Sequence, residues 1–226
     1  MTAGFEIRPI AHLESDLGEK FGVPRQAGVV EELEGRIVFE PPYRNPDALR
    51  GIEGFSHLWL IWQFSKALGR EFSPTVRPPR LGGNERVGVF ATRSPFRPNA
   101  LGLSCVRLLR VERDETRGPV LVVGGADLVD GTPIFDVKPY LPYADCRPEA
   151  LSGFAPDAGR TLAVAFAPGA EARIPKEKRA ALRGVLANDP RPRYQDDPER
   201  VYGLSFAGKN VRFRVADGLL TVDAVE

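Results

Sequence analysis

The stretch Arg86–Ser104, with the sequence RVGVFATRSPFRPNALGLS, governs the fold predicted for this chain, because a proline-braced turn in it separates two apolar runs. Apolar residues near both ends of the stretch are typical of short strands. Pro95 and Pro98 each lack a backbone N–H group and disfavour the helical conformation in the residue before them. We therefore expect two strands joined by a rigid, non-helical loop over Ala91–Asn99.

This loop carries two arginines, Arg93 and Arg97, on a stiff backbone. A guanidinium group binds a carboxylate or a phosphate through two hydrogen bonds, and it also stacks on flat rings. The loop is therefore either a clamp for a ligand or a turn whose arginines are solvated. These residues alone favour neither interpretation.

Further strands are predicted on both sides of the loop. The following runs are short, apolar or β-branched, and bounded by turn residues: Phe5–Ile10, Arg36–Glu40, Leu58–Phe64, Val87–Thr92, Leu101–Glu112, Val120–Leu128 and Ile134–Val137. Long helical patterns between the strands are missing. Residues 1–150 therefore predict a mainly β fold with a seven-stranded, barrel-like N-terminal domain. A short helix is expected over Pro46–Arg50, with Asn45 as its N-cap.

Residues 151–226 follow a different pattern and predict a small α+β domain. An amphipathic helix is expected over Pro175–Asn188, because Ala181, Leu182, Val185 and Leu186 share one face. The strands expected around it are Thr161–Phe166, Val201–Phe206, Val211–Val215 and Leu219–Val225, with a hairpin turn at Asp217–Gly218.

Charge is distributed unevenly along the chain. The formal net charge of the 226 residues is only +1, which gives the whole molecule no general affinity for polyanions. Between Arg70 and Arg107, however, seven arginines face two glutamates, with Phe72, Phe90 and Phe96 among them. This mixture is typical of a surface that binds nucleic acid, and it also occurs in ordinary solvated surfaces.

Several kinds of site are excluded by what the sequence lacks. The two cysteines and two histidines form no zinc-ligand pattern, and no GxSxG, GxGxxG or GxxxxGK[ST] motif occurs. There is also no apolar run of transmembrane length and no signal-peptide pattern. We therefore expect a cytoplasmic protein that uses no metal and contacts no membrane.

The remaining motifs form an ordered set: VPRQ at 23–26, EPPY at 40–43, FSHLW at 55–59, RPPRLGGNERVGVFATRSPFRPN at 77–99 and DLVDGTPIFDVKPYLPY at 127–143. In this order they resemble the TsaA-like family, whose characterised bacterial members are the tRNA methyltransferases called TrmO. DPRPRY at 189–194 extends the resemblance to the C-terminal domain. The resemblance implies an S-adenosylmethionine-dependent enzyme on a β-barrel that N6-methylates threonylcarbamoyladenosine beside the tRNA anticodon. It also implies a homodimer with the cofactor near the subunit interface.

The resemblance implies a set of cofactor-binding residues: Pro24, Arg25, Gln26, Ser65, Lys66, Arg93, Leu103, Gly124, Gly125, Ala126 and Asp127. An arginine and a glutamine suit the polar ends of S-adenosylmethionine, two adjacent glycines allow close backbone approach, and Leu103 would form an apolar wall. The chain departs from the family after its tryptophan-rich strand, where Ser65 stands at a position that is often histidine.

Catalysis should require alignment of the reacting atoms and removal of one proton from the attacking nitrogen, because the methyl donor is already activated. We predict Asp136 and Asp130 as candidate bases, and Tyr140 or Tyr143 as rings that stack on a base or face the cation. Asp130 is also the first residue of an ordinary Asp-Gly turn, whereas Asp136 lies in an otherwise apolar run.

Contacts with tRNA phosphates are predicted for Arg77, Arg80, Arg86, Arg97, Arg191 and Arg193. Arg191 and Arg193 would make the C-terminal domain a tRNA-binding appendage. Of the two loop arginines, Arg93 would bind the cofactor and Arg97 would contact tRNA. Two alternatives stay open. One is a non-catalytic RNA-binding or regulatory module on the same barrel, and the other is a methyltransferase or hydrolase of small molecules.

Overall fold

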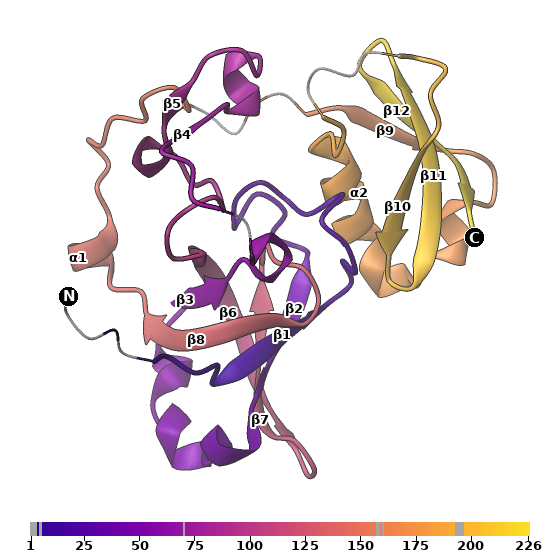
Figure 1. Ribbon diagram of the computed structural model, residues 1–226. Coiled ribbons are helices and arrows are strands. Elements are labelled where there is room, and N and C mark those ends of the chain that lie inside the picture. The colour runs from indigo at the N-terminus through magenta and orange to yellow at the C-terminus, as the bar shows by residue number, and fades with distance from the viewer. Residues whose placement is uncertain (1–3, 5, 70, 157–158, 160, 193–196) are drawn as a thin grey trace.

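Six antiparallel strands close into a barrel in the N-terminal part of the chain (Figure 1). In their order around the barrel they are β1 (Ala11–Ser15), β2 (Glu34–Phe39), β7 (Gly118–Gly124), β6 (Leu101–Asp114), β3 (His57–Gln63) and β8 (Thr132–Pro139). The barrel closes where β8 pairs with β1, with Ala11 opposite Ile134. The computed structural model describes residues 4, 6–69, 71–156, 159, 161–192 and 197–226.

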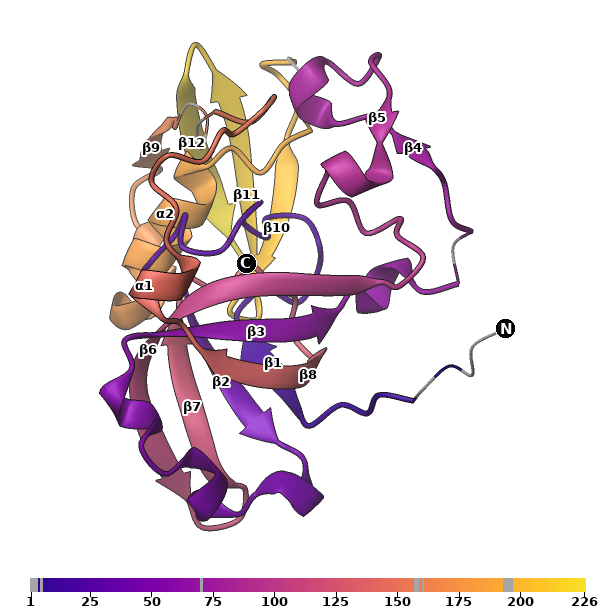
Figure 2. The same cartoon turned by 90° about the vertical axis from the view of Figure 1, so that its left-hand side faces the viewer.

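Strand β3 shows why these sequences form a barrel. Leu58, Leu60 and Trp62 point into the interior, and the residues between them point outward, as strand geometry requires. Buried apolar residues from the other barrel strands fill the same core, among them Leu13, Ile37, Val106, Leu121 and Ile134. Figure 2 shows the outward faces of β6, β3 and β8, which lie side by side.

The prediction of a mainly β fold is confirmed, but the predicted number of barrel strands is wrong. The run Val87–Thr92 is not part of the barrel: only Val87–Gly88 is extended, as β5, and it pairs with β4 (Thr75–Val76). The chain then turns into a 3₁₀ helix over Val89–Ala91. The apolar pattern was misleading because Val89 is buried while Phe90 is exposed to solvent.

The predicted position of the first strand, Phe5–Ile10, is also wrong, because the strand begins later in the sequence. Within the described residues 6–10 the structure has no strand, and β1 begins at Ala11, while Phe5 lies outside the described residues. Pro9 has no N–H group for a strand ladder and Ile7 is exposed, whereas Ala11 and Leu13 are completely buried. Burial against the barrel core therefore decides where the strand begins.

Short helices connect the strands. Most are 3₁₀ helices: Pro41–Tyr43, Pro46–Leu49, Ile52–Gly54, Ser65–Ala67, Pro79–Leu81, Val89–Ala91, Glu171–Arg173 and Lys176–Lys178, and one short α-helix is α1 (Pro142–Asp145). The helix expected near Pro46 is present, and its cap is confirmed, since the Asn45 side chain accepts a hydrogen bond of 3.0 Å from the Asp47 N–H group.

Among its described residues, the C-terminal domain has a four-stranded sheet and one α-helix. In sheet order its strands are β10 (Tyr202–Phe206), β11 (Lys209–Ala216), β12 (Leu219–Val225) and β9 (Ala163–Phe166), and β9 runs parallel to β12. The helix α2 (Arg179–Ala187) buries the four apolar residues predicted for its inner face. The predicted hairpin turn is present, with positive φ angles at both Asp217 and Gly218.

The segment 16–33, between β1 and β2, belongs to the C-terminal core although it is encoded inside the barrel sequence. Leu17, Val30 and Leu33 are buried in the same cluster as the apolar residues of α2 and β10–β12. In Figure 1 this indigo segment lies between the barrel and α2. The two domains are therefore joined by shared packing as well as by the chain that links them.

Candidate active site

Three of the residues predicted to bind the cofactor meet at one end of the barrel. Nη1 of Arg93 donates a hydrogen bond to Oε1 of Gln26, which joins the proline-braced loop to the segment 16–33. Asp127, just after β7, lies close enough for the positive charge of Arg93 to act on its carboxylate. A cationic, an amide and an anionic side chain are thus gathered from three separate parts of the sequence.

The Asp127 carboxylate is held by a chain of hydrogen bonds from the barrel interior. Nε1 of Trp62 donates to Oγ of Ser104 at 2.9 Å, and this hydroxyl donates to Oδ1 of Asp127 at 2.6 Å. Burial raises the pKa of Asp127 above its usual value, while the hydrogen bond from Ser104 and the charge of Arg93 act in the opposite direction. The carboxylate is therefore partly desolvated and fixed in direction.

Two adjacent glycines bring the segment 16–33 against the end of β7. A Cβ atom on Gly124 would lie 2.9 Å from the Glu31 carbonyl oxygen, and one on Gly125 would lie 3.0 Å from Cα of Gly28. The Gly28 N–H group donates to the Gly125 carbonyl at 2.8 Å. The close approach at these buried glycines is thus between two parts of the protein backbone, and it sets the position of Pro24–Gln26.

The C-terminal domain holds the other side of this segment. The Phe21 ring is stacked on Tyr202 and Phe213, each with a centroid distance of 6.4 Å. A Cβ atom on Gly22 would lie 2.1 Å from Cδ1 of Leu204, which is completely buried. Packing on β10 and β11 therefore places the nearby residues Pro24–Gln26, which begin two positions after Gly22.

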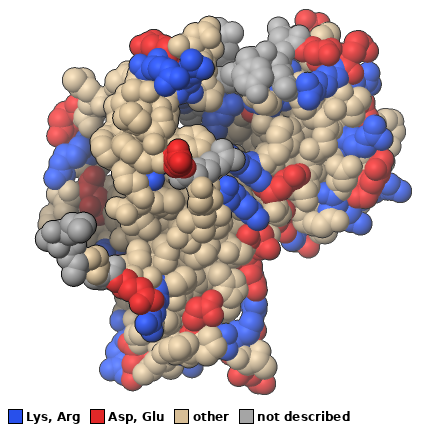
Figure 3. All heavy atoms as spheres, in the orientation of Figure 1, with Lys and Arg blue, Asp and Glu red and all other residues tan. Residues whose placement is uncertain are grey.

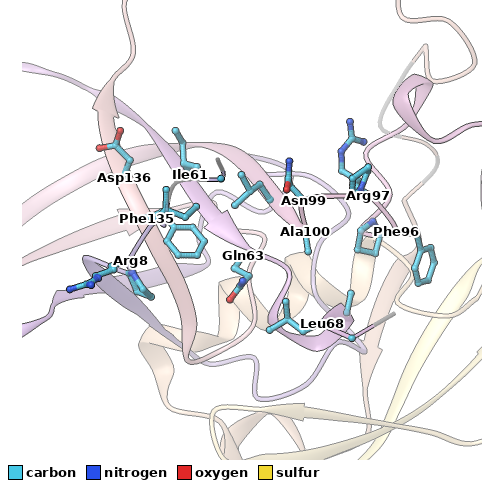
Figure 4. Close-up of a pocket in the computed structure, with 18 residues that line it drawn as sticks. Arg8, Ile61, Gln63, Leu68, Phe96, Arg97, Asn99, Ala100, Phe135 and Asp136 are labelled. Atoms are coloured by element: carbon cyan, nitrogen blue, oxygen red, sulfur yellow. The ribbon is translucent and has the colours of Figure 1, made fainter. Parts of the chain in front are cut away.

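A second group of predicted residues lies on the outside of the barrel. A cleft of about 1060 Å³ is lined by residues that include Ile61, Gln63, Leu68, Phe96, Arg97 and Asp136. Figure 4 shows Asp136 and Arg97 at opposite ends of this cleft, with Ile61 and Gln63 of β3 between them. The Asp136 side chain is 42% exposed and pairs with Nζ of Lys138 at 3.0 Å.

Strand geometry separates Leu103 from the Asp127 cluster. Successive side chains of β6 point to opposite faces, so Ser104 points inward to Asp127 and Leu103 points outward, where it is 56% exposed. Ser65 and Lys66 lie in the 3₁₀ helix Ser65–Ala67 after β3, next to Ala67 and Leu68 of the cleft. The predicted cofactor residues thus form an inner and an outer group within one chain.

The other two candidate catalytic residues lie elsewhere. Oδ1 of Asp130 accepts a hydrogen bond of 2.9 Å from the Ser15 N–H group, which stabilises the turn before β8. The Tyr140 ring packs near Trp59, with centroids 5.8 Å apart, and burial is the main cause that raises its pKa. Neither Asp130 nor Tyr140 is among the described residues that line the cleft with Asp136.

The predicted phosphate-binding arginines differ in how they are presented. Arg77 and Arg86 are exposed in the lobe that carries β4 and β5, where Figure 3 shows a concentration of positive side chains, and Arg80 is half-buried there. Nη1 of Arg97 is used within its own loop, donating to the carbonyls of Val89 at 3.3 Å and Thr92 at 2.7 Å.

Arg191, in the C-terminal domain, is turned inward. It is only 9% exposed, and its Nε and Nη2 atoms donate to the two carboxylate oxygens of Asp189 at 2.8 and 2.9 Å. Its carbonyl accepts a hydrogen bond from Nη2 of Arg25 at 3.3 Å, a further link between the domains. Arg193 lies outside the described residues.

Known proteins resemble the chain over both domains. Residues 12–146 match the tRNA-methyltransferase O N-terminal domain, and residues 159–226 match the TrmO C-terminal domain. The chain belongs to the TrmO family. The resemblance inferred from the sequence motifs is therefore confirmed.

Individual relatives match nearly the full chain. The tRNA (adenine(37)-N6)-methyltransferase of Escherichia coli K12 is 43% identical, covering 99% of both chains. A Pseudomonas aeruginosa protein named putative S-adenosylmethionine-dependent methyltransferase RcsF is 40% identical over 88% of this chain and 87% of its own. The crystal structure of TrmO from Pseudomonas aeruginosa superposes with a TM-score of 0.81, at 32% identity and full coverage of both chains.

Two residues of this TrmO-family site, Trp62 and Ser104, were missed by the sequence analysis. Ser104 shares the inner face of β6 with the buried Val106, so a polar residue at an inward position was the available signal. Its partners, Trp62 and Asp127, depend on strand register, which the sequence does not give directly. In the described ranges, no helix is both long and apolar enough to cross a membrane.

Proposed function

We propose that the protein is an S-adenosylmethionine-dependent methyltransferase that methylates N6 of threonylcarbamoyladenosine next to the anticodon of tRNA. The observation that carries this proposal is the cluster of Gln26, Arg93 and Asp127, formed by three segments of a chain that belongs to the TrmO family. The names of its relatives, a tRNA (adenine(37)-N6)-methyltransferase and an S-adenosylmethionine-dependent methyltransferase, support the same reaction.

The cluster fits the chemistry of S-adenosylmethionine, whose amino-acid end carries one positive and one negative charge. A guanidinium group such as that of Arg93 binds a carboxylate, and the Asp127 carboxylate, directed by Ser104, suits an ammonium group or ribose hydroxyls. Pro24 is buried and would contribute shape rather than charge. These residues would hold the cofactor together with Arg25, and the buried backbone at Gly124–Ala126 would support them by its packing on the segment 16–33.

The cofactor supplies a methyl group already activated on a sulfonium. The chain must then align the attacking N6 atom and accept the proton that N6 loses when its new bond to carbon forms. Asp136 is the proposed acceptor, since it is an accessible carboxylate in the outer cleft. Tyr140 lies beside Trp59 rather than in that cleft, and it is proposed only as a ring that stacks on a neighbouring part of the substrate. Asp130 is the weaker candidate because its carboxylate caps the Ser15 N–H group.

The proposed partners are tRNA and a second copy of the chain in the cytoplasm. Exposed Arg77 and Arg86, with Arg80 beside them, are the proposed phosphate contacts. A homodimer would also explain Leu103, because an outward, exposed leucine serves as a cofactor wall when it faces the site of another copy.

The test is mass spectrometry of nucleosides from tRNA that carries threonylcarbamoyladenosine, incubated with the protein and isotopically labelled S-adenosylmethionine. We expect the label on the N6 methyl group of that nucleoside alone. Cofactor binding without any methyl transfer would favour a non-catalytic RNA-binding module. Methyl transfer to a small molecule with no affinity for tRNA would favour the other alternative.

A further inference from the structure

Two phenylalanines of the lobe 71–99 are exposed in a way that the protein core does not require. Phe90 is 72% exposed and Phe72 is 50% exposed, and their rings are stacked with centroids 6.4 Å apart and planes 27° apart. This distance lies within the range of favourable aromatic pairs. Large apolar side chains left in solvent in this way mark a binding surface.

The Phe90 ring is held in place rather than left free to move. The 3₁₀ helix that carries it is fixed because the Val89 N–H group donates to the Pro74 carbonyl at 3.0 Å, and Val89 itself is buried. The Arg97 guanidinium lies 5.6 Å from the centroid of the Phe90 ring. Since Arg97 is itself bound to the carbonyls of Val89 and Thr92, the ring and the guanidinium form one preformed unit.

We propose that Phe90, supported by Phe72 and Arg97, is a stacking surface for an unpaired nucleobase of the RNA substrate. Exposed aromatic rings and arginine planes bind single-stranded bases by stacking, and positive charge around them holds the backbone. Arg77 and Arg86 provide such charge in the same lobe. This inference rests on the proposed function, because it assumes that the substrate is RNA.

The position of Phe90 along the chain links this surface to the candidate active site. Arg93 follows three residues later and binds Gln26, and three residues of extended chain span at most about 10 Å. Successive bases of one strand are about 3.4 Å apart along a helix axis. A base stacked on Phe90 would therefore lie within a few nucleotides of the cofactor site proposed at Arg93 and Gln26.

The test is fluorescence anisotropy with a labelled RNA hairpin that carries the anticodon loop of a threonylcarbamoyladenosine-containing tRNA. Phe90→Ala should weaken binding by roughly 5-fold to 100-fold, and Phe90→Trp should preserve it, because stacking is what is lost. The slope of affinity against salt should stay unchanged, since no charge is removed. The matched control is Phe55→Ala, which removes another exposed phenylalanine that lies outside the lobe 71–99.

Three results would overturn the inference. The first is a Phe90→Ala protein that binds the hairpin as tightly as the wild type. The second is equal weakening by Phe55→Ala, and the third is a change in sedimentation coefficient on Phe90→Ala, which would place the ring in a subunit contact. If the wild-type protein itself fails to bind the hairpin, the proposed function fails instead, so the two failures are distinguishable.

Discussion

The segments 16–33 and 71–99 meet at the hydrogen bond between Arg93 and Gln26, but they are built in opposite ways. The first is packed between two domains, with Leu17, Val30 and Leu33 buried in the C-terminal core. The second presents Phe72, Phe90 and exposed arginines to solvent. One side of the candidate site is therefore part of a core, and the other side is a surface.

This difference indicates that the two segments have different functions. A small cofactor needs a few polar groups held in fixed positions, which buried packing supplies. A large polyanion needs an accessible surface with positive charge and stacking rings, which the lobe supplies. In this account the C-terminal domain serves cofactor binding by fixing Pro24–Gln26, a role that the sequence analysis did not give it.

The largest effect is expected for Asp136, which lies in strand β8 and lines the outer cleft beside residues of the segment 71–99. Asp136→Asn should lower the single-turnover rate on the order of 100-fold, because it removes the proposed proton acceptor. The affinity for S-adenosylmethionine should stay unchanged in calorimetry. Lys138→Ala is the control, since it breaks the same ion pair and keeps the carboxylate. Equal rate losses in the two variants would assign Asp136 to the ion pair alone.

The next largest effect concerns the segment 16–33, which is packed against the C-terminal core. Gly22→Ala should weaken S-adenosylmethionine binding at least about tenfold, because its new methyl group would displace the segment from Leu204, and a shift of about 1 Å in a site is enough for such losses. Gly208→Ala is a matched control: both glycines have positive φ angles, but a Cβ atom on Gly208 meets only open space.

The affinities of the Gly22→Ala and Gly208→Ala proteins for S-adenosylmethionine are measured by calorimetry at a temperature where both variants are folded. If Gly22→Ala does not fold, Phe21→Ala replaces it, since that change removes the stacking on Tyr202 and Phe213 without adding volume. Normal cofactor affinity in the folded Gly22 or Phe21 variant would mean that the C-terminal domain does not position this segment.

A smaller effect is expected for the pH dependence of cofactor binding. Burial raises the pKa of Asp127, so its carboxylate takes up a proton at a higher pH than an ordinary aspartate. The protonated form cannot pair with an ammonium group, and affinity should therefore fall as the pH decreases through this raised pKa. Asp127→Asn should bind roughly tenfold more weakly near neutral pH and lose this step. A step that persists in the variant would belong to another group.

The smallest effect concerns the phosphate contacts. Arg77→Ala and Arg86→Ala should each reduce the slope of log affinity against log salt by roughly 0.7–0.9, measured with the anticodon hairpin. Arg212→Ala, in β11, is the control, because it removes an arginine from the C-terminal sheet, where it pairs with Glu226 at 3.5 Å. A slope that changes only in the Arg212 variant would move the RNA surface to the C-terminal domain.

Local features of the fold were predictable from the sequence, and long-range ones were not. The Asn45 cap and the buried face of α2 follow from neighbours a few residues apart, and both are confirmed. Val87–Thr92 was assigned to the barrel because its pattern cannot show that Phe90 faces solvent. Whether a short run joins a sheet depends on distant partners, and propensity does not contain that information.

The candidate site shows the same limit. Motif resemblance indicated Gln26, Arg93 and Asp127, and the structure brings these three residues together. The Trp62–Ser104 support depends on the pairing of β3 with β6, and the inward position of Arg191 depends on Asp189. Neither follows from composition or charge. The sequence therefore indicates candidate chemical groups, and it does not give the packing and hydrogen bonds that position them.

The most direct test of the division between the two segments is a calorimetric titration of S-adenosylmethionine into the wild-type, Gly22→Ala and Phe90→Ala proteins. Gly22→Ala should lose at least about tenfold in affinity, and Phe90→Ala should bind as the wild type does. Wild-type affinity for Gly22→Ala together with weakened binding for Phe90→Ala would contradict the account.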